Sequence, residues 1–236
     1  MSDSILSNVT AMAASRQLGI TSMGMQQTIT RLTTGKQINT AQDNAVGLAQ
    51  ADQFNAESIA ATQNVQTQNN AYFQAQAGDG YLGEATTQVQ TLVQLDSGGN
   101  GTSAEATAVI GNAQAAITKA LANAPAGSAA ATDLALAATA VSGIASATDA
   151  GKASAALTAI DVARGDFGAT MASTQSASNL FGIESENATS EESNVMDANV
   201  GNEVVNLTKW QVLSQAGTSA LSSANSSSQY ILALFR

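Results

Sequence analysis

The sequence predicts an all-α protein, folded as a long antiparallel helical hairpin whose N- and C-terminal helices pair as a coiled coil. Three observations predict this class. The 236 residues include one proline, which leaves room for long uninterrupted helices. Apolar residues near both ends of the chain recur at steps of three and four, the spacing of one face of an α-helix. Residues 96–151 are rich in Ala, Gly, Ser and Thr and have too few large side chains to build a core of their own.

Two long helices are predicted in the N-terminal half. The first runs from about residue 4 to residue 33, and Thr33-Thr34-Gly35 supplies its stop signal. The second begins near Asp43 or Asn44, either of which can cap a helix N-terminus, and extends to about Leu95. Near its end a heptad seam is formed by Leu82, Ala85, Val89 and Leu92.

Two further long helices are predicted in the C-terminal half. The third has the most regular pattern, with alternating steps of four and three through Ile160, Arg164, Phe167, Met171, Thr174, Ser178 and Phe181. The acidic stretch from Glu184 to Glu192 contains no glycine or proline, so this helix can continue through it. The fourth helix runs from about Asn194 to Phe235. Between the two halves, Ala-rich stretches occupy about 103–123 and 129–147.

This layout predicts three regions. Residues 1–44 with 193–236 form a terminal coiled-coil domain, and residues 45–95 with 152–192 form a second helical bundle. Residues 96–151 form a reduced central region at the turn of the hairpin.

A pair of terminal helices leaves more apolar surface than one partner helix can cover. Such seams are buried either by a third helix of the same chain or by other copies of the protein. Contacts that pair head to tail between copies need not close, and a filament then follows. The predicted subunit interface consists of Ile5, Val9, Met12, Ile20, Met23, Ile29, Leu32, Val204, Leu207, Trp210, Leu213, Leu221, Ile231 and Phe235.

An uncharged polar run lies within the last predicted helix, beside its apolar stripe. It includes Ser222, Asn225, Ser226 and Gln229. These residues form either an ordinary solvated face or a polar wall that faces a water-filled conduit.

The composition excludes several classes of function. The chain has no His and no Cys, which removes the usual zinc sites, Cys nucleophiles and His-based triads. The net charge of −10 and only 8 basic residues disfavour nucleic-acid binding. No apolar run has the roughly 18 residues of a membrane span, and the first residues do not resemble a signal peptide. The acidic pairs have the pattern of a solvated face, so neither an enzyme nor a metal or cofactor site is expected.

Two segments at opposite ends of the chain are similar to a known family. Residues 31–49, RLTTGKQINTAQDNAVGLA, resemble the N-terminal signature of bacterial flagellins. Residues 206–221, NLTKWQVLSQAGTSAL, and the final residues ILALFR resemble the flagellin C-terminus. The likeness covers about 1–95 and 152–236, and the motifs occur in the order found in that family.

The resemblance implies a structural subunit that self-assembles into the flagellar filament. The paired terminal helices would form the inner tube, with the Ser/Asn face toward the lumen, and the second and third helices would form the next shell. The resemblance also implies export to the cell exterior by a dedicated secretion apparatus. The implied partners are other copies of the chain, an export chaperone, and the cap and junction proteins of the flagellum.

One segment departs from the pattern of the family. Many flagellins carry two arginines and a glutamate in the stretch that Toll-like innate receptors bind, and Thr91, Val93 and Gln94 stand at these positions here. Loss of the charged donors and the acceptor predicts weak receptor activation. The alternatives to a filament subunit are a hook–filament junction protein with flagellin-like ends, a coiled-coil signalling module of the chemoreceptor-rod type, and, more remotely, an enzyme.

Overall fold

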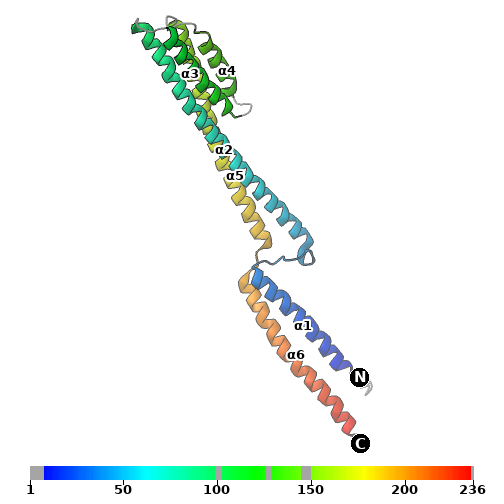
Figure 1. Ribbon diagram of the computed structural model, residues 1–236. Coiled ribbons are helices and arrows are strands. Elements are labelled where there is room, and N and C mark those ends of the chain that lie inside the picture. Colours follow the sequence, from blue (N-terminus) through cyan, green and yellow to red (C-terminus); the bar gives the residue numbers. More distant parts are fainter. Residues whose placement is uncertain (1–7, 99–102, 126–128, 145–149, 235–236) are drawn as a thin grey trace. The chain divides into compact units, whose positions relative to one another are not determined.

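The computed structural model describes residues 8–98, 103–125, 129–144 and 150–234, and these residues are predominantly helical (Figure 1). The helices are α1 (Val9–Thr34), α2 (Ala41–Gly98), α3 (Ser103–Ala122), α4 (Ala129–Ser142), α5 (Ala150–Met196) and α6 (Val200–Leu234). The described residues include no β-strand, and one isolated antiparallel bridge joins Lys36 to Asp197. The predicted all-α class is therefore confirmed.

The helix ends follow from local polar residues. The side chain of Asn8 accepts a hydrogen bond from the N–H of Ala11 at 2.9 Å and caps α1. At the other end, Gly35 adopts the left-handed conformation (φ 71°) that favours glycine, so the predicted stop is confirmed. Asn44 has a non-helical backbone inside α2, and its side chain accepts from the N–H of Gly47 at 3.0 Å. Asn44 thus caps the long part of α2.

The acidic stretch of α5 is helical as predicted, and the helix continues to Met196. Because α5 extends this far, α6 begins at Val200 rather than near Asn194. The side chain of Asn199 accepts a hydrogen bond from the N–H of Asn202 at 3.1 Å and caps α6.

The chain forms two compact units, and α2 and α5 contribute to both. The first unit consists of Met1–Ala56 with Ala188–Arg236, and the second consists of Glu57–Asn187. The boundaries fall near residues 56 and 188, whereas the sequence pattern placed them near 44 and 193. The central helices α3 and α4 belong to the second unit.

In the first unit α1 and α6 lie side by side and run antiparallel (Figure 1). The segment after α1 pairs with the segment before α6 through two backbone hydrogen bonds. The N–H of Gln37 donates to the carbonyl of Met196 at 2.7 Å, and the N–H of Ala198 donates to that of Gly35 at 2.8 Å. A small apolar cluster of Ile38, Ala51 and Met196 is buried nearby.

In the second unit α2 and α5 pack antiparallel along the predicted seam. Ile160 and Phe167 of that seam are fully buried. The ring of Phe167 lies against Gly78 of α2, where an added Cβ would stand 2.4 Å from the ring. This close approach explains a glycine in the middle of a helix. Polar pairs continue the contact, among them the 2.8 Å ion pair between Arg164 and Asp79.

The Ala-rich central region completes the core of the second unit. Its helices α3 and α4 contact each other and supply Ile117, Leu134 and Val141, which are almost fully buried. Alanines between these side chains allow close helix approach, so a sequence too weak for an independent core packs against α2 and α5.

Candidate assembly interface

Polar side chains are buried along α1, which packs against α6. The buried residues of α1 are Thr21 and Thr28. Their hydroxyls each donate to the backbone carbonyl four residues earlier, that of Gln17 or Gly24, at 2.9 Å. These threonines are therefore buried without leaving an unpaired donor.

Two glycines set the distance between these helices. The indole of Trp210 on α6 lies over Gly24, where an added Cβ would stand 2.7 Å from the ring. Farther along, a Cβ on Gly217 of α6 would stand 3.2 Å from Leu18 of α1. The single tryptophan thus packs within the chain, against the backbone of α1.

Several large apolar side chains of this pair are exposed on its outside. On α1, Val9, Met12, Ile20 and Met23 are between 51% and 65% exposed. These four residues fall within one sector of the helix, because Val9 and Ile20, like Met12 and Met23, are eleven residues or about three turns apart. On α6, Val205 and Val212 are 67% and 63% exposed. The pair therefore departs from the usual arrangement, because threonine hydroxyls are buried in it while several large apolar side chains lie exposed on its outside.

The predicted interface residues divide into three groups. The exposed residues are Val9, Met12, Ile20, Met23, Ile29, Val204 and Leu213. The half-buried residues are Leu32, Leu207, Trp210 and Leu221. Of these, Trp210 contacts Gly24 of α1. Ile5 and Phe235 lie outside the described residues, and for Ile231 the structure describes the helical backbone alone.

Sequence reasoning missed Val205 and Val212. It followed the apolar steps of four and three through Val200, Val204 and Leu207, of which Leu207 is half-buried. The signal that could have revealed the outer face is the spacing of seven residues between the two valines, which places them on one side of the helix.

The predicted lumen residues lie near the end of α6. Ser222, Asn225 and Ser226 are exposed, and the Ser226 hydroxyl donates to the carbonyl of Ser222 at 3.0 Å. The side chain of Gln229 lies outside the described residues.

The segment that departs from the flagellin pattern lies in α2 of the second unit. The Thr91 hydroxyl donates to the carbonyl of Thr87 at 2.9 Å, and Val93 packs against the core. Gln94 is exposed.

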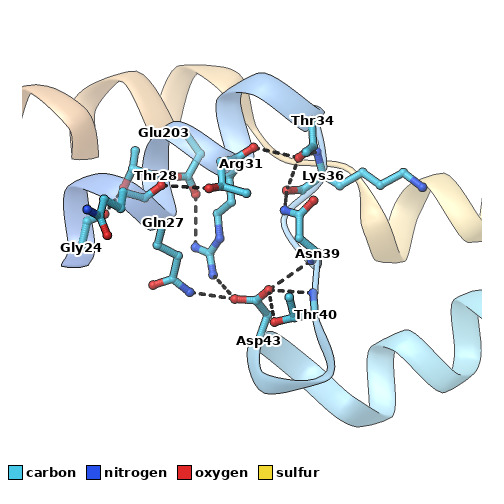
Figure 2. Close-up of polar contacts among 12 residues, drawn as sticks. Gly24, Gln27, Thr28, Arg31, Thr34, Lys36, Asn39, Thr40, Asp43 and Glu203 are labelled. Atoms are coloured by element: carbon cyan, nitrogen blue, oxygen red, sulfur yellow. Dashed lines mark hydrogen bonds and ion pairs between the residues drawn. The ribbon is translucent and has the colours of Figure 1, made fainter. Parts of the chain in front are cut away.

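A polar cluster joins the end of α1 to the starts of α2 and α6 (Figure 2). Arg31 of α1 lies 3.7 Å from the Asp43 carboxylate and 3.5 Å from that of Glu203. Asp43 also accepts hydrogen bonds from the side chain of Gln27 at 2.7 Å and from the N–H of Thr40 at 3.0 Å. Glu203 is 8% exposed, so its charge is offset mainly by Arg31.

These hydrogen bonds lower the pKa of Asp43 from 3.8 to about 2, with the bond from Gln27 as the largest cause. The folded protein therefore stabilises the ionised carboxylate. The contribution to stability is present above pH 3.8 and is lost as the pH falls from about 4 toward 2.

The variant Asp43→Asn is expected to lower the stability of the first unit at neutral pH by about 1 kcal/mol, because a charged acceptor at a partly solvated site is lost. Emission from the single tryptophan, Trp210, reports unfolding of this unit. The difference between wild type and variant should shrink as the pH approaches 2. A constant difference from pH 7 to pH 2 would contradict the role given to Asp43.

Two aspartates, Asp133 and Asp166, interact within the second unit. The pKa of Asp166 is raised because its carboxyl group can hydrogen-bond with that of Asp133 on α4 when one of them is protonated, and because burial disfavours its charge. The pair therefore adds to the stability of the folded protein when the pH is near or below the ordinary pKa of an aspartate. This contribution is lost as the pH rises through the raised pKa of Asp166.

Two structural features bear on membrane insertion and metal binding. Among the described residues, no helix is long and apolar enough to span a membrane. In the same part of the chain, no three acidic side chains converge as metal ligands would.

Comparisons with known proteins identify both ends of the chain. The sequence profile of the bacterial flagellin N-terminal helical region matches residues 5–118, and that of the bacterial flagellin C-terminal helical region matches residues 151–235. Polar flagellin A of Vibrio parahaemolyticus is 33% identical over 110 residues, which are 46% of this chain and 29% of that protein. Flagellin B of Vibrio cholerae is 32% identical over 112 residues, 46% of this chain and 30% of that protein.

The match therefore covers less than a third of the length of these relatives. The two profiles, in contrast, cover most of this chain and follow one another in the order expected for paired terminal helices. The chain belongs to the bacterial flagellin family.

Proposed function

We propose that this protein is a structural subunit that self-assembles into the bacterial flagellar filament and so serves motility. The observation that carries the proposal is the outward apolar face of the α1–α6 pair. Val9, Met12, Ile20 and Met23 of α1, with Val212 of α6, are all more than half exposed in the single chain. A second copy of the chain is the partner that the flagellin family supplies for this surface.

Burial of these side chains between copies drives assembly. Covering apolar surface contributes about 25 cal/mol per Å², or roughly 1.5–3 kcal/mol for a fully buried aliphatic side chain. Several such side chains on each copy, repeated along a lattice, stabilise a long polymer even when each contact is modest. In this arrangement the α1–α6 pair forms the inner tube and the second unit forms the surrounding shell.

The remaining features have places in the same proposal. The exposed polar side chains of Ser222, Asn225 and Ser226 line the lumen through which new subunits pass. The chain is exported to the cell exterior, with an export chaperone, the filament cap and the junction proteins as partners. The names of the Vibrio relatives, all flagellins, support a place in the flagellum.

Deletion of residues 1–30 or 205–236 is expected to abolish polymerisation, because each deletion removes one of the outward apolar faces. The second unit has its own core and should stay soluble. Negative-stain microscopy and sedimentation of the purified fragments measure the outcome. Filaments of normal length from either fragment would refute the proposal. A full-length chain that forms short, non-growing caps would favour the junction protein instead.

Purified protein is expected to activate Toll-like flagellin receptors at least about tenfold less than a flagellin with the charged pattern, because charge-assisted hydrogen bonds are lost. The variant T91R/Q94E restores charge at two positions without altering half-buried Val93. It should recover part of the signal in a receptor reporter assay. Potent activation by the unaltered chain would contradict this prediction.

A further inference from the structure

Methionine side chains are unevenly exposed in this chain. Met12 and Met23 of α1 are 62% and 63% exposed. Met196 is buried in the small cluster of the first unit, and Met171 is half-buried against the core of the second. Met25, also on α1, is half-buried. Among the five methionines in the described residues, Met12 and Met23 are therefore the most accessible to a dissolved oxidant.

The two exposed methionines lie on one face of α1. Eleven residues separate them, so they are offset by only about 20° after three helical turns. Val9 and Ile20 occupy the neighbouring strip of the same face and are also more than half exposed. Met12 and Met23 thus belong to the surface that the proposed function buries between copies.

We propose that Met12 and Met23 form an oxidation-sensitive modification site that controls assembly, an inference that rests on the proposed filament function. The oxidant is a hydroperoxide such as hydrogen peroxide. The thioether sulfur attacks one peroxide oxygen, an S–O bond forms and the O–O bond breaks. The released hydroxide takes the proton of the oxygen now bound to sulfur and leaves as water, so sulfur is oxidised by two electrons and the peroxide is reduced by two.

The product changes the character of the assembly face. Methionine sulfoxide is polar, whereas the thioether is apolar and flexible. Burying a strong acceptor without a hydrogen-bond partner opposes association. Oxidised free subunits therefore assemble poorly, whereas in an assembled filament the neighbouring copy covers both sulfur atoms and protects them. Methionine sulfoxide reductases reverse the change.

The test compares polymerisation of the full chain before and after treatment with hydrogen peroxide. Mass spectrometry of peptides measures sulfoxide at each methionine, and sedimentation measures the polymer. Met12 and Met23 should be oxidised before Met171 and Met196. Full oxidation of the two exposed sites should lower the polymer yield at least about tenfold. Treatment with the reductases should restore the yield, and circular dichroism should show unchanged helix content.

Matched variants separate this site from the other methionines. The M12L/M23L variant keeps the apolar volume, so peroxide should leave its polymer yield within twofold of the yield that the same variant gives without treatment. The M171L variant should remain sensitive. The inference is overturned if wild type with both sulfoxides assembles within twofold of the untreated chain, or if M12L/M23L loses assembly equally on oxidation. If the untreated chain does not polymerise, the proposed function fails and this inference fails with it.

Discussion

Replacing Val205 and Val212 together by aspartate is expected to abolish filament formation while leaving the subunit folded. Both side chains are more than three-fifths exposed in the single chain, so the carboxylates remain hydrated there and cost little. In the polymer, two charges on each copy would have to be buried without partners. The penalty is several kcal/mol per ion, which exceeds the contribution of the valines that they replace.

The matched control retains the apolar surface. The V205I/V212I variant keeps β-branched side chains at both positions and should polymerise as the wild type does. Circular dichroism establishes that both variants are helical, and electron microscopy with sedimentation measures polymer. Normal filaments from V205D/V212D would show that the outer face of α6 lies outside the assembly contacts.

Replacing Phe167 by alanine is expected to destabilise the second unit by about 3–5 kcal/mol, because a fully buried ring is lost and a cavity remains beside Gly78. Phe167 is the largest fully buried side chain of the described structure. Its ring also sets the spacing of α2 and α5, so the surrounding helices cannot close the cavity without moving their backbones.

Val162 provides the control on the same helix, since it is 51% exposed. The variant V162A should change stability by less than about 0.5 kcal/mol. Urea unfolding followed by circular dichroism measures both variants. A loss below 1 kcal/mol for F167A would contradict the packing of α5 on α2 described above.

Much of the fold follows from local patterns that a sequence displays directly. The alternating steps through Ile160 and Phe167 predict the buried face of α5, and Thr33-Thr34-Gly35 predicts the end of α1. Spacing, capping groups and glycine conformation act within a few residues of one another, so these features need no tertiary information.

The features that sequence reasoning missed depend on contacts between distant residues. Arg31 and Glu203 meet across 172 positions, and no local pattern connects them. Asp166 pairs with Asp133 because α4 packs against α5, which the Ala-rich composition of the central region did not reveal. The identity of the buried face of each terminal helix was also hidden, because Thr21 is buried and Val212 is exposed, contrary to the usual preference of each residue type.

Association of copies of this chain through the apolar outer faces of α1 and α6 is the step on which filament formation depends. Its most direct test is the amount of sedimentable polymer formed by the purified full-length protein, seeded with short filament fragments, as total concentration rises. We expect a sharp threshold above which every added subunit enters filaments visible by electron microscopy. A chain that stays monomeric at every concentration, while retaining the helix content of the folded protein, would contradict the account.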